Sequence, residues 1–547
     1  MLRRSPVLTA AALSAALLPV AASAQTIEQR LYDEGMNRSQ VMQTAHVLTD
    51  VFGPRLTGSP ALERAGMWAL DQLTSWGLTN PTRAPWSWGH QGWSNEYINA
   101  HMISPVPTPL VVEALGWTPS TAGEVRGTAV HLRSPGGMTE GQWTAFADSV
   151  RGVVRGAVVL VGQPGVTQGG GPSLQQRIAD EEARRRFNPR PDDAQAPGRP
   201  ATPPARPNTP PPSAFVAPAT VAARLDSLLR VSGALVRVNP AGMENGLIRA
   251  FSNRSFNVDT APPTVVMRDE DFGRIVRLIH STAPAARALS APVLAFDVRN
   301  TTYSGRETEH NYLAEISGTT PGEVVMLGGH LDSWHAATGA TDNAAGSAVM
   351  MEAARLLATT FRETNTRPRR TIRVALWTGE EQGLLGSRAY VEQTFGTAEA
   401  PTAAWAGFNG YLNVDSGTGK LRGAVVFGPT TAAEILDGYL DPLDSLGVAG
   451  ARPTFSRAIG GSDHTAFNNA GLPGISMGQD PIAYFSTTWH TNVDTYERLL
   501  PRDLQQAAVA VATAVYRLAT DPTPLPRFAP ADMPANPNAA RPGASSR

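Results

Sequence analysis

The stretch TIRVALWTGEE, residues 371–381, ends an apolar run with two adjacent glutamates, Glu380 and Glu381. The apolar run is typical of a buried β-strand. Two carboxylates side by side at the exit of such a strand repel each other and lose hydration, so the pair calls for a cation or a proton nearby. One glutamate can bind a metal ion while the other transfers a proton. A metal site would need further ligands from other parts of the chain.

The second half of the chain alternates between apolar strands and helices. Four apolar runs predict strands at residues 324–327, 371–376, 410–414 and 424–427. Apolar residues at helical spacing predict helices at 344–358, 432–440 and 503–519. This alternation predicts an α/β fold with a mostly parallel central sheet flanked by helices.

The first half has a different character. Residues 27–80 carry apolar residues at helical spacing and are predicted to be helical. From residue 110 onward, short β-rich pieces such as 128–132 and 156–161 are separated by glycine-rich turns. Residues 177–187 are predicted to form a charged helix.

Two segments are predicted to lack ordered structure. Residues 188–218 are dominated by proline, alanine and arginine, and they cannot bury enough apolar surface to become ordered. We interpret them as a flexible insertion, with a proline-rich ligand for another domain as the alternative. The tail at 521–547 is rich in proline and alanine and is predicted to be disordered.

The N-terminus has the pattern of a secretory signal. Arg3 and Arg4 precede an apolar stretch at 7–20, and Ala22-Ser23-Ala24 fits a cleavage site before Gln25. A membrane anchor is the weaker interpretation, because the run is short and rich in alanine. The sequence therefore predicts a signal peptide at 1–24 and an exported protein, periplasmic or secreted, without a membrane span after cleavage.

Composition excludes several classes of function. The chain has 547 residues, enough for more than one domain, and a formal net charge of −1. It contains no basic block suited to nucleic acid. It contains no cysteine, which excludes disulfides and thiolate metal ligands. No Gly-x-Ser-x-Gly or P-loop lysine motif occurs, so serine hydrolase and nucleotide hydrolase interpretations lose support.

Residues suited to metal binding follow the predicted strands of the second half. Besides the two glutamates they are His330, Asp332, Asp342, Asp415 and His490. Sites in open α/β sheets form at the carboxyl ends of strands, and these nitrogen and oxygen donors suit Zn²⁺ or a similar divalent ion.

Each of these residues also has a structural explanation. Asp342 can be a helix N-cap, Asp415 can start a turn, and Glu381 can cap the helix that follows it. Their occurrence together, each at the end of a separate strand or loop, is what favours a metal site.

Three motifs carry a resemblance to a known family: GGHLDSW at 328–334, LWTGEEQG at 376–383 and GGSD at 460–463. Over about residues 300–520 the chain resembles the di-zinc exopeptidases of the bacterial leucyl aminopeptidase and glutamate carboxypeptidase family, peptidase family M28. The resemblance implies a zinc exopeptidase fold, phosphorylase/hydrolase-like, with an inserted β-rich protease-associated domain at 106–290. The peptidase domain is then expected at 25–105 and 291–520.

The resemblance also implies the metal ligands. His330 and Asp415 would bind one Zn²⁺ ion, Glu381 and His490 would bind a second, and Asp342 would bridge the two ions. The expected cofactor is therefore two Zn²⁺ per chain.

Other residues receive roles in the same way. The resemblance makes Glu380 the general base and makes Asp332 the residue that orients His330. It implies a strained or cis peptide between Asp342 and Asn343, a position where many members have a second aspartate.

Four further residues are candidates for the substrate pocket: Ser462, Asp463, His464 and Tyr484. The alternative for residues 462–464 is a turn and helix start, and Tyr484 can instead pack beneath His490. We interpret His335, five residues after His330, as a bystander.

The resemblance implies an exported metallo-exopeptidase that hydrolyses dipeptides or short peptides. Similarity to the glutamate carboxypeptidases favours a carboxypeptidase or dipeptidase, whereas the wider family favours an aminopeptidase. A glutaminyl cyclase-like acyl transferase with one zinc and a non-catalytic receptor-like protein are weaker alternatives, because every ligand position and Glu380 are retained. The resemblance also suggests a homodimer.

Overall fold

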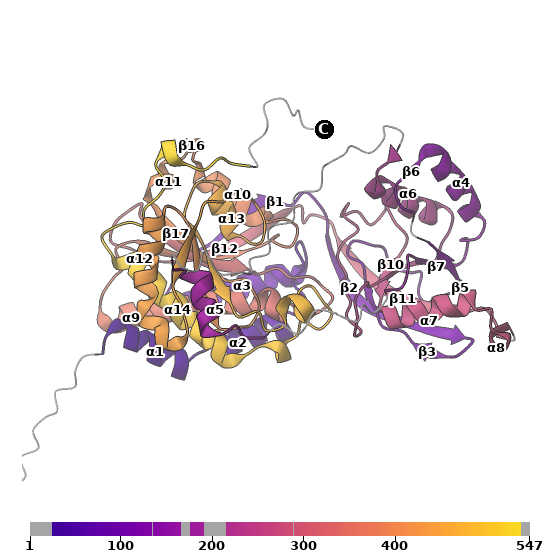
Figure 1. The fold of residues 1–547 in the computed structure, drawn as a ribbon, viewed down its shortest axis with the longest axis horizontal. Helices are drawn as coiled ribbons and strands as arrows, with labels where there is room; N and C mark the ends of the chain where they lie inside the picture. The colour runs from indigo at the N-terminus through magenta and orange to yellow at the C-terminus, as the bar shows by residue number, and fades with distance from the viewer. Residues whose placement is uncertain (1–24, 134, 166–175, 191–214, 288, 538–547) are drawn as a thin grey trace, which may run out of the picture.

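The computed structural model describes residues 25–133, 135–165, 176–190, 215–287 and 289–537. The expected signal peptide at 1–24 lies outside these ranges, as does most of the expected flexible insertion at 188–218. The described chain forms two eight-stranded sheets, one in each half of the view in Figure 1.

The first sheet carries the motif-bearing strands at its centre. Its order is β1-β12-β14-β13-β17-β20-β18-β19. The central strands β14, β13, β17 and β20 are parallel to one another, and β18 pairs parallel with the edge strand β19. Their bounds are Thr371–Trp377, Val324–His330, Phe408–Asn413, Gly474–Gln479, Leu421–Phe427 and Ala451–Thr454.

The remaining pairings of this sheet are antiparallel. β1 (Thr79–Ser87) pairs with β12 (Thr308–Ile316), which pairs with β14, and β18 runs antiparallel to β20. The expected α/β fold with a mostly parallel sheet is confirmed, with antiparallel strands toward both edges.

Helices cover both faces of the first sheet. One face packs against α1, α2, α3, α9, α12 and α14, whose bounds are Ile27–Asn37, Val41–His46, Pro60–Ser75, Ala345–Thr364, Thr430–Leu440 and Pro501–Thr520. The other face packs against α10 (Leu385–Thr394) and α13 (His464–Asn469). The expectation that residues 27–80 are helical holds for α1 to α3, and β1 then begins at Thr79.

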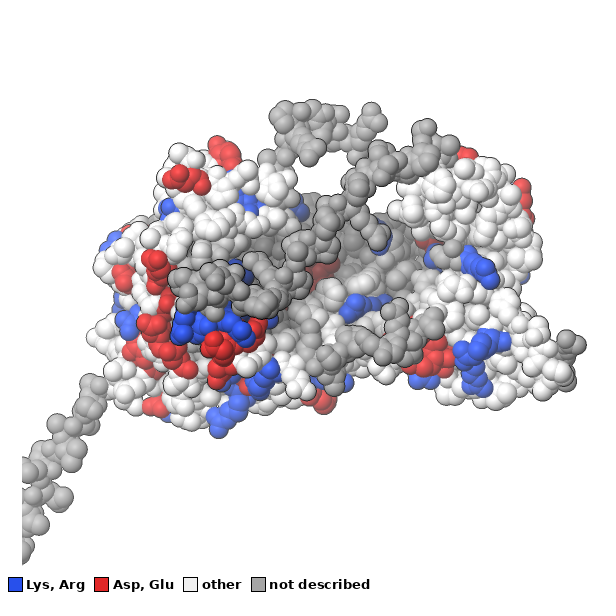
Figure 2. Space-filling view, viewed as in Figure 1, with Lys and Arg blue, Asp and Glu red and all other residues white. Residues whose placement is uncertain are grey.

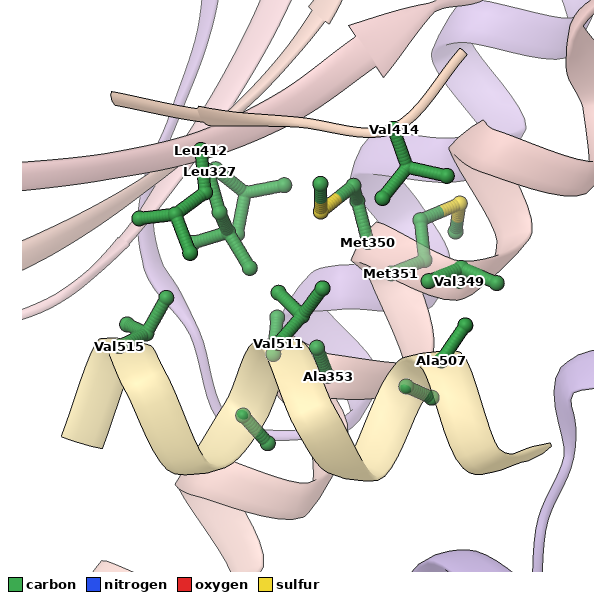
Figure 3. Packing of buried hydrophobic residues seen from close by; sticks show 14 of the residues in the cluster. Leu327, Val349, Met350, Met351, Ala353, Leu412, Val414, Ala507, Val511 and Val515 are labelled. Carbon is green, nitrogen blue, oxygen red and sulfur yellow. The ribbon is translucent and has the colours of Figure 1, made fainter. Parts of the chain in front are cut away.

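Alternation along the strands explains this two-sided packing. In β13, Val325 and Leu327 lie in the cluster formed with α9 and α14, whereas Val324 and Met326 lie in the cluster on the opposite face. Successive side chains of a strand point to opposite faces, so a strand buried on both sides must be apolar throughout. Figure 3 shows the first of these clusters, where α9 and α14 meet Leu327 and Leu412.

The second sheet has the order β3-β2-β11-β5-β7-β9-β10-β4. Its strands span Thr108–Pro109, Gly92–Ser104, Val293–Tyr303, Val125–Leu132, Val158–Val161, Val236–Pro240, Thr264–Met267 and Val112–Ala114. Helices α4 (Glu140–Arg151), α6 (Pro218–Val231) and α7 (Asp269–His280) accompany it. Because β2 and β11 belong to this sheet, it extends beyond the expected domain limits of 106 and 290 on both sides.

The described chain also contains short strands and short α-helices. They are β6 (Met138–Thr139), β8 (Phe215–Val216), α8 (Pro284–Arg287), β15 (Gly396–Thr397), β16 (Ala400–Pro401) and α11 (Ala403–Gly407). None of the described helices is long and apolar enough to cross a membrane.

One helix that follows a strand of the second sheet in sequence packs against the first sheet. Helix α5 (Asp180–Phe187) follows β7 in sequence, yet it lies beside β18 of the first sheet. Arg177, just before it, forms ion pairs with Asp480 and Asp503. In Figure 2, side chains of both charges gather on this part of the surface.

The expectation of a disordered tail is wrong for residues 521–537. Leu525 is buried, and its backbone N–H donates to Asn409 Oδ1 at 2.7 Å. The Phe528 ring contacts Phe427, with 5.3 Å between centroids. These apolar residues have places to pack on the first sheet, which the proline-rich composition concealed, whereas 538–547 lie outside the described residues.

Candidate active site

The expected ligand residues converge at the carboxyl ends of the central parallel strands. His330 ends β13, Glu380 and Glu381 follow β14, and Asp415 follows β17. Asp342 lies in the turn before α9, and His490 lies in the loop after β20. Loops at this edge of neighbouring parallel strands meet, which is why residues 160 positions apart can share one site.

The side chains form two groups that share Asp342. In the first group, His330 Nε2 lies 3.2 Å from Asp342 Oδ1 and 3.3 Å from Asp415 Oδ1. In the second, His490 Nε2 lies 3.1 Å from Asp342 Oδ2 and 3.0 Å from Glu381 Oε2. Within each group the potential ligand atoms all lie within 4.8 Å of one another. Each Asp342 oxygen therefore faces a different group.

The chemistry of these groups fits divalent metal ions. Each group offers one imidazole nitrogen and two carboxylate oxygens, a donor set suited to Zn²⁺. The Glu381 side chain is 2% exposed, and its Oε1 atom has no hydrogen-bond partner among the described residues. A buried carboxylate oxygen without a partner is costly, and a cation at this position would remove that cost.

Glu380 lies outside both groups although it is adjacent to Glu381. Its backbone N–H donates to Asp332 Oδ1, at 3.3 Å, and its side chain lines the cavity beside the site. Burial raises the pKa of Glu380 well above its usual value. Burial also raises the pKa of Glu381, to about 7. A carboxyl group in this position can accept a proton from a neighbouring water and give it up again.

Asp332 contacts more than His330. The His330 Nδ1 atom lies 3.0 Å from the backbone oxygen of Asp332 and 3.6 Å from its carboxylate. The carboxylate instead accepts from Thr57 Oγ1 and from the backbone N–H groups of Glu380 and Glu381. The backbone carbonyl is thus the nearer partner of the imidazole, and the carboxylate holds the chain at the two glutamates.

The peptide bond between Asp342 and Asn343 is cis, in line with the resemblance. The Asn343 side chain donates to the backbone oxygen of Val414 and accepts from the N–H of Gly346. The amide thereby connects the turn of Asp342 to the end of β17, next to Asp415. Asparagine serves here because it supplies a donor and an acceptor at once.

Two residues that hold the backbone near the ligands were not predicted from the sequence. Asp494 accepts from the backbone N–H groups of Thr341 and Asp342, at 2.6 and 3.0 Å. Arg55 is fully buried and donates to the backbone oxygens of Leu331 and Gly339. Both residues hold backbone segments on either side of the ligands, and both act on partners more than 150 positions away. No local motif marks such contacts.

A cavity of about 530 Å³ opens beside the two groups. Of the four candidate pocket residues, Ser462, His464 and Tyr484 line it, together with Phe485 and Trp489. Asp463 is fully buried and is not among the lining residues.

His335 lies apart from both groups. Its Nε2 atom lies 2.7 Å from the backbone oxygen of Ala114 in β4, and its ring packs against Trp93. It belongs to the contact between the two halves of the molecule.

Comparisons with known proteins point to one family. A model of peptidase family M28 matches residues 311–515, the range that holds all the ligand residues named above. Carboxypeptidase Q of Mus musculus is 34% identical over 218 residues, which make up 40% of this chain and 43% of that relative. The alignment therefore spans less than half the length of the curated relative.

Solved structures share the fold over nearly the whole chain. A peptidase M28 precursor from Shewanella amazonensis has a TM-score of 0.60 at 23% identity, and the match covers 92% of this chain and 98% of that chain. A zinc aminopeptidase from Bacillus subtilis has a TM-score of 0.51 at 16% identity, covering 90% and 98%. The two-part architecture is therefore shared beyond the range of the family model.

Proposed function

Because residues 311–515 match a model of peptidase family M28, we propose that this protein is a zinc-dependent exopeptidase that acts on dipeptides or short peptides. The observation that carries the proposal is the pair of donor groups sharing Asp342, with Glu380 next to them but outside both. This arrangement provides two metal positions and a separate carboxyl group for proton transfer.

The residues of the site divide the reaction between them. His330 and Asp415 would hold one zinc ion, Glu381 and His490 the other, and Asp342 both. Zinc bound by these residues would supply Lewis acidity, which would lower the pKa of a water and polarise the scissile carbonyl. Glu380 accepts the proton of the attacking water and delivers it to the leaving amine. Asp332 fixes the backbone of both glutamates and so keeps Glu380 directed at the cavity.

The cavity fits a short peptide. A volume of about 530 Å³ lies in the range of small-molecule pockets. Phe485 and Trp489 offer apolar surface for a substrate side chain, and Ser462 and Tyr484 offer hydroxyl groups for its backbone. We propose these residues as the determinants of substrate fit.

We propose a carboxypeptidase or dipeptidase rather than an aminopeptidase. The similarity to carboxypeptidase Q supports this choice. The charges around the cavity also support it: each carboxylate among the described lining residues is a proposed metal ligand or Glu380, so none is left to pair with a free amino terminus.

Three dipeptide substrates separate these possibilities: one with both ends free, one blocked at the amino end and one blocked as a C-terminal amide. We expect zinc-dependent hydrolysis of the free dipeptide and no hydrolysis of the amide. Cleavage of the amide but not of the N-blocked dipeptide would identify an aminopeptidase. No hydrolysis of any of the three would contradict the exopeptidase proposal.

Three further properties are proposals from the sequence. The signal pattern at 1–24 supports export, and the resemblance supports both a homodimer and a protease-associated domain built on the second sheet. Analytical ultracentrifugation of the purified chain tests the dimer.

A further inference from the structure

The domain built on the second sheet, called the second domain from here on, has a loop that reaches the proposed metal site. This loop, residues 246–253, is held in place by contacts within its own domain. The Gly116 N–H donates to the backbone oxygen of Phe251 at 2.7 Å, and Ile248 and Ala250 are buried in a small cluster with Val266. The loop is therefore a fixed part of the second domain.

The loop contacts the segment that carries His490. Ile248 and Asn492 exchange two hydrogen bonds: the Ile248 N–H donates to Asn492 Oδ1 at 2.9 Å, and the Asn492 N–H donates to the Ile248 oxygen at 3.0 Å. Arg249 Nε donates to the backbone oxygen of Trp489 at 3.1 Å. The second domain thus holds the residues on both sides of His490.

Arg249 makes a second kind of contact with the same tryptophan. Its guanidinium lies over the Trp489 ring, 4.8 Å from the centroid, and a further donor reaches the Phe485 oxygen at 3.5 Å. Burial lowers the pKa of Arg249, and among the described residues no carboxylate offsets that burial. Its partners are the backbone oxygens of Trp489 and Phe485 and the Trp489 ring. Arg249 therefore positions the segment that contains His490.

The His490 side chain is held between aromatic rings. Trp489 stacks on it at 4.0 Å between centroids, and Phe251 contacts its edge at 5.4 Å. His490 has a φ of +61°, in the left-handed region that non-glycine residues rarely adopt. Such a conformation persists where neighbouring contacts enforce it, and the 246–253 loop supplies several of them.

We propose that Arg249 is a positioning residue for His490, through which the second domain completes the metal group of Asp342, Glu381 and His490. The inference rests on the proposed function, because it concerns the zinc ion of that group. The other ligands, His330 and Asp415, follow strands of the first sheet and have no hydrogen bond or ring contact with the described 246–253 loop. The loop therefore affects one metal position and not both.

Zinc titration of the metal-free full-length protein tests this inference. Zn²⁺ is added in competition with a chromophoric chelator to the wild type, Arg249→Ala, Arg249→Lys and the control Arg254→Ala. Arg254 is an exposed arginine close by that forms no hydrogen bond or ion pair with the described residues of the His490 segment. Circular dichroism of each metal-free variant verifies its fold.

We expect Arg249→Ala to weaken one of the two binding steps about tenfold or more, as changes to residues that orient ligands do. The other step should stay within about twofold. Arg249→Lys should recover part of the loss, because lysine can still donate to the Trp489 oxygen and lie over its ring. Arg254→Ala should match the wild type. Should Arg249→Ala fail to fold, Arg249→Lys and Phe251→Leu must still weaken the same single step.

Two results would overturn the inference while leaving the proposed function in place: unchanged binding in Arg249→Ala, or equal weakening of both steps. A wild-type protein that binds no zinc would overturn both.

Discussion

At the scale of single residues, two neighbouring glutamates have separate tasks. Glu381 turns toward His490 and Asp342, while Glu380 stays outside both donor groups and lines the cavity. Asp332 holds the backbone N–H groups of both. Adjacent carboxylates are tolerable here because the proposed metal ions would neutralise the charge of Glu381, and burial raises the proton affinity of Glu380, which suits it to accept a proton.

Glu113 in β4 supplies a residue-scale prediction of pH dependence. Burial raises the pKa of Glu113 from 4.5 to about 8. Between these values the unfolded chain releases the proton while the folded chain retains it, so the free energy of unfolding falls as pH rises. In Glu113→Gln this loss disappears, and we expect the variant to gain on the order of 3 kcal/mol over the wild type between pH 5 and pH 8.

Urea denaturation of both proteins at the two pH values measures this difference. The pKa assignment fails if Glu113→Gln differs from the wild type by the same free energy at pH 5 and at pH 8.

At the scale of elements, α5 connects the second domain's chain to the first sheet by side-chain packing. The buried Phe187 ring lies against Gly423 of β18 and Gly478 of β20. A Cβ atom on either glycine would approach the Phe187 ring to 2.4 Å, so both glycines are needed for this contact. Arg422 adds an ion pair with Asp180 at the start of the helix.

Phe187→Ala should release α5 from the sheet. Truncating a buried phenylalanine costs about 3 kcal/mol or more, and this cost falls on the docking of one short helix rather than on the core. We expect trypsin cleavage within α5, at its arginines 184–186, to become more than about tenfold faster. Mass spectrometry of the fragments over time provides the rate.

Phe215→Ala is the matched control, because Phe215 is 42% exposed. It should leave cleavage within α5 unchanged. Equal cleavage rates in Phe187→Ala and the wild type would show that the phenylalanine does not hold the helix.

The elements differ in how far the sequence could predict them. β14 was predicted to within one residue of its end and β13 from its first residue, because strands buried on both faces are apolar throughout, although β13 extends past the predicted end at 327 to His330. β2 was missed because few of its residues are buried, and its pairing residues in β11 lie 189 to 211 positions later. The second sheet therefore extends beyond the expected domain limits of 106 and 290.

The ligands were predictable for a related reason. Most of them are residues of ligand type at or just after the end of a strand, or just before a helix, where loops of a parallel sheet meet, whereas His490 lies in the loop after β20. Arg55, Asp494 and Arg249 act instead on backbone atoms of distant segments, and such contacts leave no mark on the local sequence. The sequence could therefore name the groups that bind metal but not those that hold them in place.

At the scale of the whole molecule, the proposed metal site lies where the 246–253 loop of the second domain meets the carboxyl ends of the strands of the first sheet. The first sheet provides His330, Asp415 and the glutamates, while the second domain supports His490 through Arg249. The strands β2 and β11 join the two parts, and Figure 1 shows them side by side there. The shared fold with the Shewanella amazonensis peptidase M28 precursor extends over both parts. The second domain is thus a structural partner of the site.

The central claim is that zinc binding and proton transfer belong to different residues. Glu380→Gln tests it most directly, with zinc content and dipeptide turnover measured on the same sample and the exposed Glu392→Gln as control. We predict about two zinc ions per chain in Glu380→Gln and a turnover reduced by about 10²–10⁴-fold, with Glu392→Gln unaffected. Near-normal turnover of a zinc-loaded Glu380→Gln enzyme would contradict the account.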